Sequence, residues 1–322
     1  MGLFDKIKEP IILKEDSSAA QQLIALQELA ISAPKDVAAK IEQDIKLLNA
    51  GIYGENNILF ELKNSHMPMV VLHDLCLQYE GLSAQIDFLI LTRGCTFVLE
   101  CKNLIGNIEI TSEGDFIRTV SYNGRYIKEG IYSPITQNQR HLQLIKQMRS
   151  AEKTNMLSRA MFEKFFYEIN RSVVVLANPK TVLNAKYAKK EVKAQVIKAD
   201  QLIAYMKKIN SEPDAVKFSE NEMLELADYY LAKHQPHCTD YIDKYKEAIN
   251  AAKPKDVQVA EEVCPKPVAE PVEQITESEA EQILCPKCNS PMVKRKAKRG
   301  ENVGKEFYGC SSYPKCRTIL DI

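Results

Sequence analysis

The chain has 322 residues, of which 45% are apolar and 27% charged, a balance typical of a globular protein rather than a disordered or fibrous one. Its 43 basic and 43 acidic residues cancel, so any attraction to nucleic acid must come from a local cluster of charge. The first residues lack the apolar core of a signal peptide and no apolar run reaches membrane-spanning length, so we expect a cytoplasmic protein that does not bind membranes and keeps its nine cysteines reduced.

The first 50 residues are predicted to be helical. Between residues 17 and 50 the spacing of apolar side chains indicates two helices, and Pro34 and Gly51 are expected to bound the second. A short third helix is expected to begin near Gly54, as the first element of the next segment.

Residues 51–210 are predicted to form one α+β domain in which helices flank a mixed sheet. Runs rich in Val, Ile, Leu and Phe indicate strands, and Asn123-Gly124 is a strong hairpin signal inside one of them. The strands are expected at residues 69–77, 84–92, 95–102, 107–111, 115–128, 171–177 and 193–198, and helices at residues 136–150 and 200–209.

The remaining 112 residues are predicted to form three further segments. Residues 211–250 form a helical extension with two amphipathic helices. In residues 251–283 Pro, Glu, Ala and Val dominate and no periodicity survives, which is typical of an acidic, extended linker. Residues 284–322 form a small C-terminal module.

Four cysteines organise this C-terminal module. Cys285 and Cys288 form one pair, and Cys310 and Cys316 form a second pair after 21 intervening residues. Four thiolates satisfy tetrahedral zinc and leave no open position, so the spacing predicts a structural zinc site. Chance pairs or a redox pair are the alternatives, which the specific spacing and the turn-forming residues beside the cysteines disfavour.

Basic and aromatic residues gather between and beside the two cysteine pairs. Basic side chains neutralise phosphates, and aromatic faces stack on bases, so we expect this module to bind DNA. The alternatives are a solvated hairpin for the charges and packing of the small core for the aromatic rings. The residues expected to contact nucleic acid are Lys294, Arg295, Lys296, Lys298, Arg299, Tyr308 and Tyr313.

The string CPKCNSPMVKRKAKRGENVGKEFYGCSSYPKC resembles the C-terminal zinc ribbons of type I topoisomerases, most specifically in its end, FYGCSSYPKC. The resemblance covers residues 284–318 and no other part of the chain. It implies contact with DNA, mostly single-stranded, by a module that is joined here to a different body.

The stretch AQIDFLILTRGCTFVLECKN, residues 84–103, carries a second constellation. If Arg93-Gly94 is a two-residue hairpin turn, Asp87 lies opposite Glu100 and Gln85 lies opposite Lys102, all on one face. Two carboxylates directly across a hairpin repel each other, and a divalent cation between them removes the repulsion.

Hard oxygen ligands in small number suit Mg²⁺ or Mn²⁺, so Asp87 and Glu100 are the predicted ligands of a catalytic cation. Lys102 beside them can hold an attacking water or stabilise charge in the transition state. Glu55 is a third candidate acid because it shares a face with apolar residues and points towards the sheet. Gln137 lies on an inward stripe of its helix with His141. The alternative is an ordinary exposed hairpin with scattered charges.

These pieces resemble the nuclease-related (NERD) domain, a branch of the PD-(D/E)xK nuclease superfamily. The matching motifs are Gly54-Glu55, QID at 85–87, ECKN at 100–103 with Gly106, and PITQN at 134–138. The resemblance implies a restriction-endonuclease-like αβββαβ core. It also implies metal ligation by Asp87 and Glu100 and catalytic roles for Lys102, Glu55 and Gln137. Ile86 replaces the proline of the superfamily motif, which removes no catalytic group.

The predicted function is therefore a Mg²⁺- or Mn²⁺-dependent DNA endonuclease that hydrolyses phosphodiester bonds, with a zinc ribbon that binds DNA. The alternatives are a catalytically silent DNA-binding adaptor and a nuclease that acts on RNA. The intact set of Asp87, Glu100 and Lys102 favours an enzyme over the adaptor, although a fold alone does not establish an activity.

Zinc removal tests the predicted organisation. A chelator is expected to unfold residues 284–318 and leave the rest folded, because the metal supplies the folding free energy that so small a module lacks. Circular dichroism during chelation, followed by thermal melting of the remaining structure, measures this. One cooperative loss of the whole protein's structure would contradict a separate module.

Overall fold

The computed structural model describes residues 7–212, 217–236 and 242–252, together with residues 285, 292–296, 306–310, 316 and 318–321 of the C-terminal module. The chain divides into two compact units, Met1–Asp256 and Val257–Ile322. Each unit is described by itself. Among the described residues, none of the helices combines the length and the apolar character that a membrane span requires.

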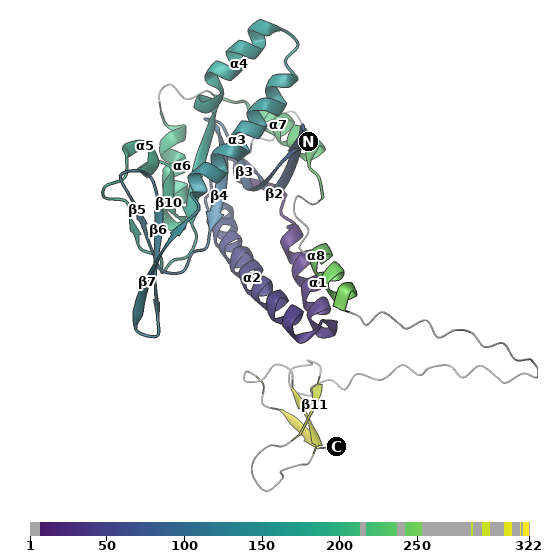
Figure 1. Ribbon diagram of the computed structural model, residues 1–322. Coiled ribbons are helices and arrows are strands. Elements are labelled where there is room, and N and C mark those ends of the chain that lie inside the picture. Colours follow the sequence, from purple (N-terminus) through teal and green to yellow (C-terminus); the bar gives the residue numbers. More distant parts are fainter. Residues whose placement is uncertain are drawn as a thin grey trace, which may run out of the picture. The chain divides into compact units, whose positions relative to one another are not determined.

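A six-stranded sheet is the centre of the first unit (Figure 1), in the order β1-β2-β3-β4-β8-β10. Strands β2, β3 and β4 form an antiparallel meander, whereas β1, β8 and β10 add to it in parallel. The strands are β1 (Pro10–Lys14), β2 (Met69–Tyr79), β3 (Leu82–Thr92), β4 (Thr96–Lys102), β8 (Asn170–Leu176) and β10 (Val196–Lys198).

Helices cover both faces of this sheet, which explains why β2, β3 and β4 are apolar on both sides. Apolar residues of α3, α4 and α7 form one core with one face, and apolar residues of α2 and α6 form a second core with the other face. The helices are α2 (Lys35–Lys63), α3 (Pro134–Ala151), α4 (Met156–Ile169), α6 (Leu202–Asn210) and α7 (Glu220–Lys233). The predicted α+β class and the order α2, β2, β3, β4, α3, β8 are confirmed.

A smaller four-stranded sheet, in the order β7-β6-β5-β9, branches off after β4. At Asn123-Gly124 both backbone φ angles are positive, 48° and 75°, as a two-residue hairpin turn requires, so the predicted hairpin is confirmed. The remaining short elements are β5 (Asn107–Ile110), β6 (Phe116–Tyr122), β7 (Arg125–Ile131), β9 (Leu183–Asn184), α5 (Lys190–Lys193) and the 3₁₀ helix η1 (Ala199–Gln201).

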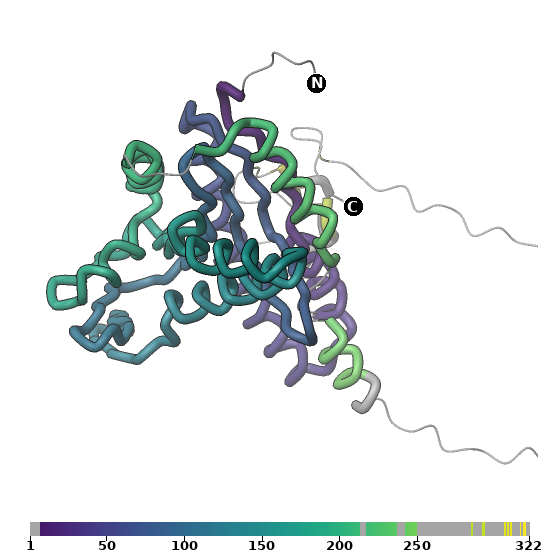
Figure 2. The backbone as a smooth tube through the Cα atoms, turned by 90° about the horizontal axis from the view of Figure 1, so that it is seen from above, coloured from purple at the N-terminus to yellow at the C-terminus, as the bar shows by residue number. Residues whose placement is uncertain are grey.

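Helices α1 (Ser18–Ser32), the first half of α2, and α8 (Ile242–Ala252) form a helical lobe, seen from above beside the sheet in Figure 2. Leu26, Val37, Ile41 and Tyr245 are its buried core. Asp44 of α2 accepts hydrogen bonds from Lys244 (2.7 Å) and Tyr245 (2.8 Å), which ties α8 to the lobe.

The predicted end of a helix at Gly51 is wrong, because α2 continues without interruption from Lys35 to Lys63. A glycine inside a helix costs only about 1 kcal/mol relative to alanine. Burial of Ile58 and Leu62 against the sheet outweighs this cost. Strand β1 and helix α4 were not predicted at all.

In the second unit the described residues form a three-stranded antiparallel sheet, in the order β11-β12-β13. Its strands are β11 (Met292–Lys296), β12 (Glu306–Cys310) and β13 (Ile319–Asp321). The predicted linker at residues 251–283 lies, beyond Ala252, outside the described residues.

Gly54 allows α2 to approach the sheet closely. A Cβ atom at this position would lie 2.7 Å from the Cβ of Asn103 and 3.1 Å from the Sγ of Cys101, both at the end of β4. The same contact places Glu55 beside the end of that strand. At Gly51, one turn earlier, a Cβ would meet nothing within 4 Å.

Gly51 and Gly54 lie in the same helix but differ in the space around a Cβ atom, so substitution of each by alanine gives a controlled comparison. Gly51→Ala should raise the free energy of unfolding by up to about 1 kcal/mol through helix propensity. Gly54→Ala should lower it by about 1–3 kcal/mol, because the added methyl group forces α2 away from β4. Urea denaturation of both variants measures the difference, and shifts of the same sign would contradict this account of the packing.

Candidate active site

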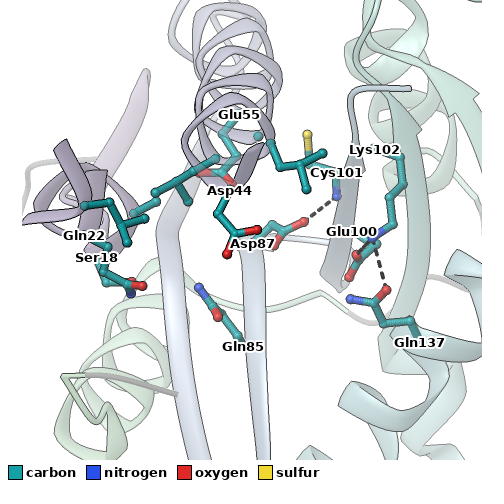
Figure 3. Close-up of a pocket in the computed structure, with 15 residues that line it drawn as sticks. Ser18, Gln22, Asp44, Glu55, Gln85, Asp87, Glu100, Cys101, Lys102 and Gln137 are labelled. Atoms are coloured by element: carbon teal, nitrogen blue, oxygen red, sulfur yellow. Dashed lines mark hydrogen bonds and ion pairs between the residues drawn. The ribbon is translucent and has the colours of Figure 1, made fainter. Parts of the chain in front are cut away.

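A cavity of about 310 Å³ lies between the helical lobe and the end of the central sheet. Figure 3 shows that side chains from α1, α2, β3, β4 and α3 line it. All five residues predicted to act in catalysis are in this lining: Glu55, Asp87, Glu100, Lys102 and Gln137.

The predicted register of the β3–β4 hairpin is confirmed. Phe88 pairs with Leu99 and Leu91 pairs with Thr96, which is the register that an Arg93-Gly94 turn produces. The backbone pairing of β3 with β4 ends at Phe88 and Leu99, one residue before Asp87 and Glu100 would pair. Instead of continuing it, Asp87 accepts a hydrogen bond from the backbone N–H of Cys101 at 2.6 Å. The acids thus lie where the strands separate and the cavity opens.

Glu100 is the most buried of the acids, with 1% of its surface exposed. Its Oε1 lies 2.5 Å from the Nζ of Lys102. Burial raises the pKa of the Glu100 carboxyl, and the attraction of Lys102 offsets only part of this rise. Glu100 is therefore a carboxylate that is kept out of water with one cationic neighbour.

Asp87 is half-buried and borders the same cavity. Burial raises its pKa well above the ordinary value, and repulsion from Glu100 and Glu55 raises it further. The hydrogen bond from Cys101 and the charge of Lys102 act in the opposite direction but do not compensate. The cavity thus has more carboxyl groups near its catalytic end than its single lysine can pair with.

Lys102 also donates a hydrogen bond to the Oε1 of Gln137, at 3.1 Å. Burial alone would lower the pKa of this lysine, but the nearby carboxylates of Glu100 and Asp87 raise it. The side chain therefore remains an ammonium group, which can donate hydrogen bonds or stabilise negative charge but cannot act as a base near neutral pH.

Contacts of Asn138 position Gln137 beside Lys102. The fully buried side chain of Asn138 donates hydrogen bonds to the carbonyl oxygens of Val98 (2.7 Å) and Val173 (3.3 Å). These contacts tie α3 to β4 and β8. Gln137, the preceding residue, is thereby held beside Lys102.

His73 holds Glu55 in place, and the sequence did not point to it. Its Nε2 lies 2.9 Å from the Oε2 of Glu55, and its Nδ1 donates to the backbone carbonyl of Glu15 at 2.8 Å. Burial would lower the pKa of His73, but the hydrogen bond with Glu55 raises it above the usual value. A histidine within an apolar strand was the only signal in the sequence.

Asp74, the next residue of β2, has a φ of 51°, which interrupts the β2–β3 ladder directly opposite Asp87. Its carboxylate accepts hydrogen bonds from the backbone N–H of Ser18 (2.7 Å) and from Gln85 (2.8 Å). This strained residue therefore fixes the start of α1 beside the cavity, and it engages the Gln85 that the hairpin pattern had placed on the same face as Asp87.

His141 lies behind Glu100, with 3.7 Å between its Nδ1 and the Oε2 of that acid. Burial and the charge of Lys102 lower the pKa of His141 to about 4, so the imidazole is neutral at physiological pH. It lies on the inward stripe of α3 one turn after Gln137, as the sequence pattern indicated.

In the second unit, the sulfur atoms of Cys285, Cys310 and Cys316 lie within 4.8 Å of one another, and all three residues are buried. Such a group of thiols suits zinc. Cys288, the predicted fourth ligand, lies outside the described residues.

The predicted DNA-binding residues are placed only in part. Lys294, Arg295 and Lys296 belong to β11, where Lys294 pairs with Tyr308 of β12. Tyr308 is half-buried. The other three, Lys298, Arg299 and Tyr313, lie outside the described residues.

Comparison with protein families gives two matches. Residues 50–177 match the model of the nuclease-related domain, and residues 282–322 match the model of the topoisomerase DNA-binding C4 zinc finger. The first match includes all five candidate catalytic residues, and the second includes all four cysteines. Neither the curated proteins nor the solved structures gave a match.

The raised pKa of Asp87 implies a stability cost when the site holds no divalent cation. Because the folded-state pKa lies above the unfolded one, this group's contribution to stability falls as pH rises from about 4, the ordinary value for Asp, through the raised value. Asp87→Asn should therefore be more stable than wild type by about 1–2 kcal/mol at pH 8 in buffer without Mg²⁺ or Mn²⁺.

This advantage should shrink as pH falls towards about 4, where the wild-type carboxyl also becomes protonated. Urea denaturation at several pH values measures it. Asp228→Asn, on the exposed surface of α7, is the control and should change little. An Asp87→Asn effect that is absent at pH 8, or independent of pH, would show that burial and the neighbouring acids do not raise the pKa of Asp87.

Proposed function

The chain carries a nuclease-related domain and a topoisomerase-type C4 zinc ribbon, and on this basis we propose that it is a metal-dependent nuclease that hydrolyses phosphodiester bonds in DNA. The observation that carries the proposal is the cavity itself, which Glu55, Asp87 and Glu100 line together with Lys102. Burying three carboxylates together is unfavourable unless their charge is compensated, so an ordinary surface hairpin does not account for this site. The excess negative charge favours a divalent cation.

Asp87 and Glu100 would hold this cation, because hard carboxylate oxygens in small number suit Mg²⁺ or Mn²⁺ with water and phosphate oxygens completing the shell. When bound, such an ion withdraws charge from the phosphate and makes a coordinated water more acidic. Glu100 would then have a second cationic partner besides Lys102.

Lys102 supplies the positive charge of the protein at this site. Gln137 and Glu100 hold its ammonium group at the cavity wall. From there Nζ can donate a hydrogen bond to a phosphate oxygen or to the attacking water, and stabilise the charge that develops during attack. Glu55, held at Oε2 by His73, adds a further carboxylate to the same cavity and can orient that water.

The zinc ribbon serves as a second contact with the substrate. Its resemblance to the DNA-binding ribbon of topoisomerases makes DNA the preferred substrate over RNA. Structural zinc would be held by Cys285, Cys288, Cys310 and Cys316. Linked binding sites raise the local concentration of substrate at the catalytic cavity without any new contact there.

Cleavage of supercoiled plasmid and of single-stranded oligonucleotides tests this function. With Mg²⁺ or Mn²⁺ the wild type should cut, and chelation of these ions should stop it. Lys102→Met keeps the side-chain length but removes the charge, and should lower the rate about 10²–10³-fold, as the loss of one transition-state donor does. Asp87→Ala should abolish cleavage.

Lys190→Met, at an exposed position of α5, is the matched control and should cut like the wild type. If no form cuts any phosphodiester while DNA binding persists, the protein is a DNA-binding adaptor. Faster cleavage of RNA than of DNA would move the assignment to a ribonuclease.

A further inference from the structure

The cavity extends beyond the catalytic residues into the helical lobe. Nine of its fifteen lining residues come from α1 and α2, which diverge as they approach the sheet (Figure 1). The α2 residues that line it recur at helical spacing, at Asp44, Leu47, Leu48, Gly51 and Glu55. The cavity is thus a groove that follows α2 and ends at the acids.

Apart from Asp44, whose carboxylate pairs with Lys244 at 2.7 Å, the residues that the lobe contributes to this groove are neutral or apolar. Leu47 and Leu48 of α2 and Gln22 and Leu26 of α1 line it, and Leu48 packs against the lobe core that contains Leu26. Leu47 is 72% exposed, so packing within the lobe does not account for its position. Lys102, at the catalytic end, is the one basic residue that the described part of the chain contributes to the lining.

The residues that line the groove determine which part of a nucleic acid, phosphate or base, can bind there. Phosphates require basic partners or backbone donors, and the walls offer leucines and a carboxylate, that of Asp44, which already pairs with Lys244. A nucleobase is flat, uncharged and largely apolar on its faces, so it can bury both faces between apolar walls. The groove therefore suits a base and disfavours a second phosphate.

The distance along α2 from the acids to the leucines also fits the length of one nucleotide. Leu48 precedes Glu55 by seven residues, which is about 10 Å along the helix axis. A nucleotide whose phosphate lies at Asp87 and Glu100 can extend its base to this depth. The volume of about 310 Å³ is at the lower end of the range for small-ligand sites, as expected for one nucleotide.

We propose that the groove between α1 and α2 binds an unpaired nucleobase adjoining the scissile phosphate, so that the substrate is single-stranded or has an unpaired end. This inference rests on the proposed nuclease function, which it extends by naming the substrate class. A paired base in a continuous duplex would first have to leave its stack, at a cost of a few kcal/mol that an unpaired base does not incur.

Photocrosslinking locates the base directly and does not depend on catalysis. Full-length protein is mixed with single-stranded DNA that carries 4-thiothymidine, in Ca²⁺ to slow cleavage, irradiated, and mapped by mass spectrometry. Crosslinks are expected within residues 18–26 and 44–51, in addition to any on the ribbon. The same bases within a continuous duplex should crosslink there at least about tenfold less, as the cost of unstacking implies.

Gly51 allows the groove to be filled without disturbing the core, because a side chain there enters open space. Gly51→Leu and Gly51→Phe should lower the lobe crosslinks progressively, by about tenfold or more for Phe, the value of one lost base contact. Ala39→Phe places the same ring at an exposed position of α2 outside the cavity, and should leave them unchanged. Thermal melting confirms that each variant is folded.

The outcomes separate the two claims. Crosslinks on the lobe that Gly51→Phe removes support the groove even if the protein cuts nothing, in which case only the nuclease assignment fails. Crosslinks confined to the ribbon, equal crosslinking of duplex, or lobe crosslinks that Gly51→Phe leaves intact overturn the groove, whether or not the protein cleaves DNA.

Discussion

The contact between the buried carboxylate of Glu100 and the ammonium group of Lys102 is the interaction on which the site depends. It lies at the end of β4 near Asp87, and the side chain of Glu100 is 2% exposed whereas that of Lys102 is 27% exposed. Burial raises the pKa of Asp87 and that of Glu100, repulsion from neighbouring carboxylates adds to the rise, and the charge of Lys102 offsets only part of it. Burial of uncompensated charge is unfavourable, and a fold retains it where a cation or a reaction requires it.

The surrounding elements hold this charged group through contacts that each depend on one particular residue. Gly54 brings α2 against β4, buried Asn138 ties α3 to two strands, and Asp74 accepts left-handed backbone geometry within a strand to fix the start of α1. Through His73, the acid of α2 is also connected to the N-terminal segment. The helical lobe is consequently part of the site, and its two diverging helices set the shape of what can enter.

The parts that the sequence predicted correctly are those set by local rules. The Arg93-Gly94 turn fixes the register of its two strands, and strand alternation then brings Asp87 and Glu100 to one face. The spacing of Cys285, Cys310 and Cys316 likewise predicted their convergence. What the sequence did not reveal depends on contacts between distant segments. His73 meets a residue 18 positions away and a carbonyl 58 positions away, and the continuity of α2 through Gly51 is decided by packing against the sheet rather than by helix propensity.

Binding of Mn²⁺ to the zinc-loaded protein tests most directly whether the buried acids form a divalent cation site. Electron paramagnetic resonance distinguishes free from bound Mn²⁺ without requiring any substrate. The account predicts one bound Mn²⁺ per chain in the wild type, with affinity lowered at least about tenfold by Glu100→Gln, since a directly coordinating oxygen should matter no less than an outer-shell partner. Mn²⁺ that stays free, or binds equally well to Glu100→Gln, would show that the three acids serve another purpose.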